Sequence, residues 1–162
     1  LHGIPISLTE VLQLQSKDST AGMSCLIGVH APDDAVVVKV LKAQGAIPFI
    51  RTNVPQIGLH SIASSNPIFG VTRNPLKLNR SPGGTSSGEG SLLASKGSIL
   101  GVGSDIAGGI RIPAHFCGVC GLKPTSGRIS DKGLTNVAQG QDKILPCIGP
   151  LSRNVVGLVE FM

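Results

Sequence analysis

The stretch Ile99–Pro113, ILGVGSDIAGGIRIP, contains the features that decide the fold class. Residues 99–103 are all apolar or glycine, which is typical of a short strand buried on both faces. A loop of small residues follows, and residues 108–117 predict a helix that Pro113 interrupts early. A buried strand that leads through a loop into a helix is the repeating step of an α/β fold.

Neighbouring segments extend this pattern in both directions. Gly3–Leu8 predicts a strand, Ala46–Arg51 predicts a buried strand, and Gly88–Lys96 predicts a short helix. A last helix is expected over residues 154–162, with Ser152 as its cap. We therefore expect an α/β protein with a partial mixed sheet and flanking helices.

Start and stop signals indicate a further helix before the second strand. Asp33 and Asp34 are expected to cap its N-terminus, and Gly45 is expected to end it. Its predicted apolar face consists of Val36, Val37, Val40, Leu41 and Gln44. By contrast, residues 61–84 form a long irregular stretch with three prolines. Loops of this length are uncommon unless they serve a function, so we interpret this stretch as the floor of an active site.

The composition narrows the class of protein. A chain of 162 residues is the size of one domain, but only 14% of its residues are charged, against about 25% in a typical globular protein. We therefore expect an interior part of a larger domain. The net charge of +5 is scattered, and the chain has no Trp, no Tyr and four Phe, which argues against nucleic-acid binding. No run of 18 apolar residues predicts a membrane-spanning helix.

The cysteine and histidine residues show no metal or redox pattern. Cys117 and Cys120 form a C-x-x-C pair, but the sequence has no second pair for zinc and no strand directly before this one. Buried structural thiols are the better interpretation. His2, His30 and His60 show no metal-ligand spacing. No metal is therefore expected.

Two segments carry a resemblance to a known family: Ser81–Gly90, SPGGTSSGEG, and Gly101–Pro113, with Cys117–Pro124, CGVCGLKP, close behind. They resemble the amidase signature family. Shorter matches are LHGIPISL at residues 1–8, RTNVPQ at 51–56, SNPIFG at 65–70 and IGP at 148–150. The resemblance implies an amidase-signature core. The family's catalytic domain is well over twice this length, so the resemblance implies that residues 1–162 are the central part of one incomplete domain.

The resemblance also implies an activity. The most similar members hydrolyse long-chain fatty acyl amides to a fatty acid and an amine, without a cofactor. A serine attacks the carbonyl carbon, a second serine held by a cis peptide relays its proton to a neutral lysine, and backbone amides hold the oxyanion. A small acyl amide is the implied ligand, and no nucleic-acid partner is implied. An intracellular, membrane-associated location is implied, with membrane contact through parts absent from this chain; no oligomeric state is indicated.

The three positions that match the family's catalytic residues are changed in this chain. Thr9, in the context Ser-Leu-Thr-Glu, stands at the position of the lysine base, Thr85 at that of the relay serine, and Gly109 at that of the nucleophile. A hydroxyl cannot accept a proton at neutral pH as an amine can, and glycine has no nucleophilic atom, so we expect no catalysis by this route. Asp105 and Arg111 are expected to hold the loop geometry. The resemblance assigns the oxyanion-binding amides to Ile106, Ala107, Gly108 and Gly109.

Other nucleophiles and other functions stay open from the sequence alone. Ser86, Ser104, or Cys117 with the nearby His115 could replace the nucleophile, although each has an ordinary structural interpretation. Three functions are compatible with the residues: a working or residual amide hydrolase, a non-catalytic protein that binds acyl amides, and a decayed or truncated coding sequence without a selected function.

Overall fold

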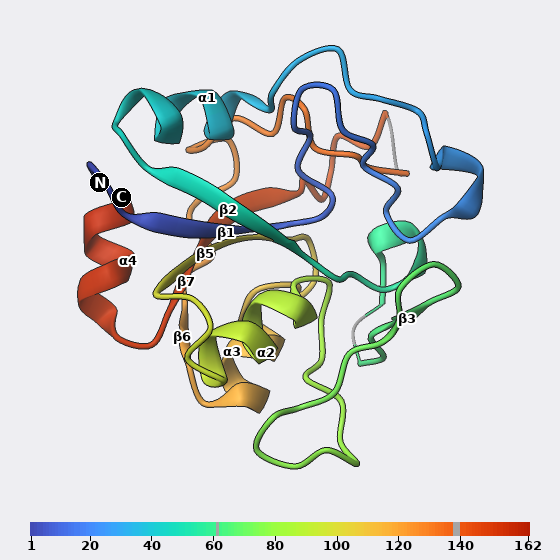
Figure 1. Cartoon of the computed structure of the whole chain (residues 1–162), viewed down its shortest axis with the longest axis vertical. Helices are drawn as coiled ribbons and strands as arrows, with labels where there is room; N and C mark the ends of the chain where they lie inside the picture. Colours follow the sequence, from blue (N-terminus) through green and yellow to red (C-terminus); the bar gives the residue numbers. More distant parts are fainter. Residues whose placement is uncertain (61, 138–139) are drawn as a thin grey trace.

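The computed structural model describes residues 1–60, 62–137 and 140–162 (Figure 1). The strands are β1 (Pro5–Thr9), β2 (Ile47–Thr52), β3 (Ser65–Asn66), β4 (Gly70–Val71), β5 (Leu100–Asp105), β6 (Cys120–Gly121) and β7 (Cys147–Ser152). Five of them form one mixed sheet in the order β2-β1-β5-β7-β6, and β3 pairs with β4. β1 runs parallel to both of its neighbours, whereas β7 runs antiparallel to β5 and β6.

The helices cover both faces of this sheet. They are α1 (Val36–Ala43), α2 (Ser87–Ala94), α3 (Arg111–Cys117) and α4 (Val155–Phe161), with 3-10 turns at Ser24–Leu26 and Gln56–Gly58. Helix α1 lies on one face, and α2 and α3 lie together on the other (Figure 1). The predicted α/β class, with a mixed sheet and flanking helices, is confirmed.

Strand β1 shows how the sequence builds the two layers. Ile6 and Leu8 are fully buried and pack with Val38 of α1 in the largest core cluster. Ser7 points to the opposite face because strand side chains alternate, and there it bonds to α2. Since β1 and β5 are parallel, their carboxyl ends, at Thr9 and Asp105, meet at one edge of the sheet. In α/β sheets this edge is where ligands bind.

Several details of the predicted helices are wrong. Among the described residues, no side chain caps α1: its N-cap is Ala35, and Asp33 and Asp34 instead pair with Lys39 and Lys42. Gly45 follows the helix with a φ of +85°, as expected of a C-terminal glycine. On the apolar face, Val38 is buried and Val40 is 49% exposed, the reverse of the prediction. The run of three consecutive valines, Val36–Val38, hid the true phase of the helix.

The strand predictions also need correction. β2 was expected to be buried, but it is an edge strand on which Ile47, Phe49 and Ile50 are exposed. Ser152 does not cap α4: it lies in β7 and donates a hydrogen bond to the Ile99 carbonyl, while the Asn154 side chain caps the helix. Strand β7 was not predicted, because its Gly-Pro pair is typical of a turn rather than of a buried strand.

Within the described part of the chain, no helix is both long and apolar enough to cross a bilayer. The four cysteines are free thiols. Cys117 and Cys147 are buried, as expected of structural thiols, whereas Cys25 is exposed.

Candidate functional site

The loop between β5 and α3 is held in shape by one buried carboxylate. Asp105 accepts hydrogen bonds from the amides of Gly108 (2.7 Å) and Ile110 (3.1 Å), and from Nε and a terminal nitrogen of Arg111, both at 2.9 Å. Burial alone would raise the pKa of Asp105, but these bonds, led by Arg111, outweigh it and lower the pKa to about 2. The predicted structural role of Asp105 and Arg111 is confirmed by these contacts.

Thr85 and Gly109 lie side by side at this loop. A Cβ atom at position 109 would lie 3.2 Å from Thr85 Oγ1, and Ser86 N–H donates to the Gly109 carbonyl at 2.9 Å. The same Cβ would approach the Ser104 carbonyl oxygen to less than 3.0 Å, so a side chain here would require the backbone to move. Thr85 Oγ1 donates to the Gly58 carbonyl at 2.9 Å. All peptide bonds among the described residues are trans, in contrast to the expected cis peptide.

Thr9 is separate from that pair. It ends β1 opposite Thr52 of β2, it is fully buried, and its Oγ1 has no hydrogen-bond partner among the described residues. A buried hydroxyl without a partner is unusual, because its desolvation is not compensated. Thr9 does not line the cavity that Thr85 and Gly109 share.

A small cavity of about 140 Å³ opens between Thr85 and the β5–α3 loop. The residues that line it are Leu59, His60, Thr85, Ile106, Ala107 and Gly109. The amide of Gly108 is engaged by Asp105, but those of Ala107 and Gly109 donate no hydrogen bond to any residue that the structure describes. The predicted oxyanion-binding role of the four loop amides stays a prediction.

His60 is a cavity residue that the sequence analysis did not identify. Its Nδ1 accepts hydrogen bonds from the amides of Ile62 (3.2 Å) and Ala63 (2.9 Å). No spacing or motif could have revealed it, because His60 is brought to the cavity by the irregular segment that precedes β3.

Comparison with known proteins identifies the family. The sequence model described as Amidase matches residues 1–162. The chain belongs to the amidase family. It is 51% identical over 158 residues to fatty-acid amide hydrolase 1 of Sus scrofa, and 47% identical over 162 residues to vitamin D3 hydroxylase-associated protein of Gallus gallus. These matches cover 98% and 100% of this chain.

The match extends to three dimensions. A solved structure of fatty acid amide hydrolase superposes with a TM-score of 0.96 at 40% identity, covering 99% of this chain and 28% of that one. The chain spans 27% of the pig enzyme and 35% of the chicken protein. The resemblance to the amidase signature family, and to its fatty-acid amide hydrolase members in particular, is thus confirmed.

Two of the other nucleophiles considered for this amidase-family chain, Ser86 and Cys117, have structural roles. Ser86 is fully buried, and its hydroxyl accepts from the Ser104 amide (2.9 Å) and donates to the Ser104 carbonyl (3.3 Å). Cys117 is 2% exposed, and burial raises the pKa of its thiol to about 11, which disfavours the reactive thiolate. These contacts leave Ser86 and Cys117 as parts of the core rather than of a reactive centre.

A buried carboxyl group beneath the site was also missed. Glu89 of α2 has no exposed surface and accepts hydrogen bonds from Ser7 Oγ (2.5 Å) and Thr52 Oγ1 (2.6 Å). Burial raises its pKa to about 7, against the opposing effect of these two hydroxyls. Glu89 therefore ties α2, which follows the Thr85 loop, to the two strands whose ends carry Thr9 and Thr52.

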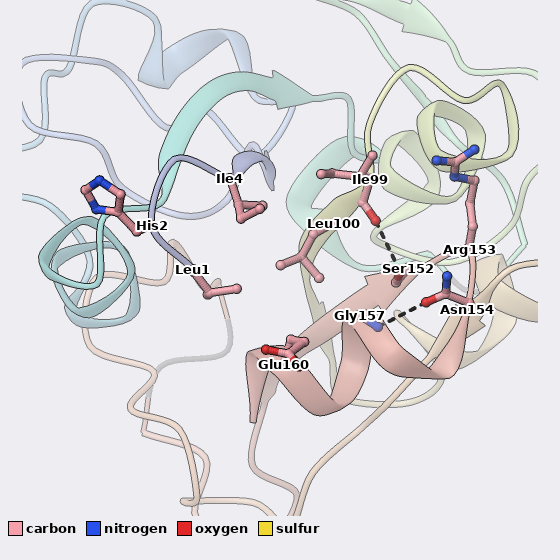
Figure 2. A pocket seen from close by; sticks show the side chains of 10 residues that line it. All are labelled: Leu1, His2, Ile4, Ile99, Leu100, Ser152, Arg153, Asn154, Gly157 and Glu160. Atoms are coloured by element: carbon pink, nitrogen blue, oxygen red, sulfur yellow. Dashed lines mark hydrogen bonds between the residues drawn. The ribbon is translucent and has the colours of Figure 1, made fainter.

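A larger cavity of about 560 Å³ lies away from all these residues (Figure 2). It is bounded by the first residues of the chain and by α4, with Leu1, Ile4 and Leu100 among its apolar walls. Ile4 precedes β1 and Leu100 begins β5, so this cavity is at the amino ends of the parallel strands. Its position, opposite the edge at which α/β sheets bind ligands, argues against a role in the family's chemistry.

Proposed function

We propose that residues 1–162 form the central part of one amidase-signature domain that is related to enzymes acting on long-chain fatty acyl amides, and that this chain does not hydrolyse them. The family consists of amide hydrolases, and the identity to fatty-acid amide hydrolase 1 of Sus scrofa supports this class of ligand. The proposal that catalysis is lost rests on three positions in the chain.

Gly109 is the observation that carries the proposal. A Cβ atom built on Gly109 would lie 3.2 Å from Thr85 Oγ1, so a side chain at position 109 would stand directly against the residue at the relay position. Glycine supplies no atom that could attack a carbonyl carbon. The Ser104 carbonyl oxygen also occupies part of the space that a serine side chain would need.

The proton path is interrupted as well. The Thr85 hydroxyl donates its proton to the Gly58 carbonyl instead of to a neighbouring catalytic group. Thr9 offers a buried hydroxyl in place of an amine, and a hydroxyl has no useful basicity at neutral pH. An enzyme that loses members of such a unit retains only the small residual rate from oxyanion stabilisation and binding.

Ligand binding without catalysis is the second candidate function. The residues that line the cavity beside Gly109 include two whose amides have no hydrogen-bond partner among the described residues, Ala107 and Gly109, and the apolar Leu59 and Ile106. Such a lining can hold the polar head of an acyl compound even though no bond is broken.

The test combines a serine-directed fluorophosphonate probe with an assay for hydrolysis of a long-chain fatty acyl amide. Circular dichroism should first show cooperative thermal unfolding, since both candidate functions need a folded cavity. We expect no covalent labelling and no release of fatty acid. Labelling that persists in both Ser86→Ala and Ser104→Ala, or measurable turnover, would show that the nucleophile has been assigned to the wrong position.

A further inference from the structure

We propose that residues 72–80, named here the basic loop, bind the surface of an anionic lipid bilayer. Two leucines of this loop enter the bilayer, and three basic side chains lie at the phosphate groups of the lipids. The inference goes beyond the proposed function and does not depend on it, because the basic loop contains none of the three altered catalytic positions.

The basic loop presents apolar side chains to solvent. Leu76 and Leu78 are 68% and 66% exposed, and no large apolar side chain in the described part of the chain is more exposed than Leu76. Figure 1 shows this loop, drawn in green, projecting at the lower end of the molecule, away from α1. It lines neither of the two cavities described above. A projecting apolar tip can enter a bilayer, whose interior requires no matching shape.

The fold itself imposes this exposure. Asn74 is buried and anchors the loop to α3, because its Nδ2 donates to the Phe116 carbonyl at 2.8 Å. Its Oδ1 accepts from the Leu76 amide at 2.9 Å, and its backbone N–H donates to the Arg80 carbonyl at 3.0 Å. Since these bonds fix the loop in advance, little conformational entropy is lost when it binds.

The charges of the basic loop are all of one sign. Arg73, Lys77 and Arg80 are exposed, and none of them forms an ion pair with a described residue. No acidic residue occurs between Asp34 and Glu89, and Glu89 has no exposed surface. A basic residue near an anionic bilayer strengthens binding roughly fivefold, so three of them contribute roughly 100-fold. The loop is therefore complementary in charge to anionic lipids.

A bilayer fits this combination of side chains better than a nucleic acid or an acidic protein does. A polyanion would engage the charges but leave Leu76 and Leu78 in water, and the chain has no Trp and no Tyr on which bases could stack. An acidic protein would need a concave apolar surface to receive the projecting leucines. An anionic bilayer places negative phosphate groups directly above an apolar layer, which matches both kinds of side chain.

Sedimentation with lipid vesicles tests the inference. We expect the chain to bind vesicles of equal parts phosphatidylcholine and phosphatidylserine roughly 100-fold more tightly than vesicles of phosphatidylcholine alone. Raising the NaCl concentration from roughly 50 mM to roughly 500 mM should remove most of this difference, because salt screens exposed charges.

The contribution of the leucines is measured with a double variant. Leu76→Ser combined with Leu78→Ser keeps every charge and should weaken binding to the anionic vesicles at least tenfold. The matched control combines Ile27→Ser with Val29→Ser, which changes an exposed apolar pair of the same spacing that no lysine or arginine flanks. This control should bind like the unmodified chain.

The contribution of the charges is measured in the same way. Lys77→Gln combined with Arg80→Gln should weaken binding roughly 25-fold, and it leaves Arg73, whose guanidinium donates a hydrogen bond within the loop. Lys132→Gln combined with Lys143→Gln makes the same change of net charge at exposed lysines outside the loop. Lys132 lies next to α1, on the other face of the sheet, so binding should remain nearly unchanged in this control.

Insertion into the bilayer can be measured directly, because the chain has no Trp of its own. The fluorescence of Leu76→Trp should shift to shorter wavelengths on anionic vesicles, and lipids with brominated acyl chains should quench it. Val29→Trp should show neither effect. Fluorescence of Leu76→Trp that stays as it is in water would refute insertion, whatever the serine variants show.

Two other results would also overturn the inference. One is equal binding to the two kinds of vesicle, or binding that the leucine and charge variants leave unchanged. The other is binding to heparin as tight as to vesicles and independent of the leucines, since it would assign the loop to a soluble polyanion. Hydrolysis of an acyl amide would refute the proposed loss of catalysis alone, because no vesicle result depends on it.

Discussion

Replacing Glu89 by glutamine should make the stability of the protein nearly independent of pH between 5 and 8. In the unmodified protein, burial raises the pKa of this carboxyl from 4.5 to about 7. The folded state therefore keeps the proton over a range in which the unfolded chain has lost it. Raising the pH then favours the unfolded state, so stability falls as the pH rises from below 4.5 through 7.

The magnitude follows from the size of the shift. Each pKa unit corresponds to about 1.4 kcal/mol, so a rise from 4.5 to about 7 lowers the free energy of unfolding by roughly 3 kcal/mol across this range. The other large pKa shifts concern groups that titrate outside this pH range. The pKa of Asp105 is lowered to about 2 and that of Cys117 is raised to about 11, so these groups act below pH 4 and above pH 9.

The hydroxyl groups around Glu89 can adjust to a glutamine. The side-chain oxygen of glutamine can accept from one of the two hydroxyls, while its –NH₂ group donates to the other. Ser7 Oγ also lies within hydrogen-bond distance of Ser98 Oγ and the Leu100 carbonyl, at 3.0 and 3.4 Å, so its proton has another acceptor. Hence Glu89→Gln should fold, and it should be more stable than the unmodified protein above pH 7.

Urea unfolding at pH 5, 6, 7 and 8, followed by far-ultraviolet circular dichroism, measures the effect; the chain has no Trp and no Tyr for fluorescence. Glu160→Gln, at an exposed glutamate on α4, is the matched control and should keep the pH dependence of the unmodified protein. An unchanged pH slope in Glu89→Gln would refute the reasoning, because it would mean that Glu89 is ionised in the folded state.

Three further predictions concern the loop and the thiols. Asp105→Asn replaces one of the two carboxylate oxygens that hold the β5–α3 loop by an –NH₂ group. Urea unfolding at pH 7 should then show that the free energy of unfolding falls by about 2 kcal/mol. An unchanged free energy would contradict the role of Asp105 in holding this loop. Gly109→Ser should remain without hydrolase activity and should be destabilised by about 1–3 kcal/mol, because its Cβ meets the Ser104 carbonyl oxygen; turnover by this single variant would show that Thr9 is not at the position of the base. Iodoacetamide at pH 7.5 should modify the exposed Cys25 well before Cys117, because the Cys117 thiol is buried and its pKa is raised. Mass spectrometry measures the two rates, and equal rates would contradict the burial of Cys117.

Local patterns in the sequence were sufficient for much of the fold. The apolar run before Ser104 predicts the central strand, and the small residues after it predict the loop, because both depend on neighbouring residues alone. The Gly-Gly pairs that precede Thr85 and Ile110 also indicated the family and two of the altered positions, and Ser-Leu-Thr-Glu at residues 7–10 indicated the third. Those assignments need only the order of residues along the chain.

The tertiary structure decided what depends on residues distant in sequence. Glu89 and Ser7 are 82 positions apart, and only their contact across α2 and β1 turns an ordinary glutamate into a buried acid with a pKa of about 7. His60 reaches Gly109 through an irregular segment, and the exposure of Phe49 follows from the place of β2 at the sheet edge. Propensity is a local property, whereas burial, pKa and proximity depend on how distant segments pack, and no pattern of neighbouring residues encodes that packing.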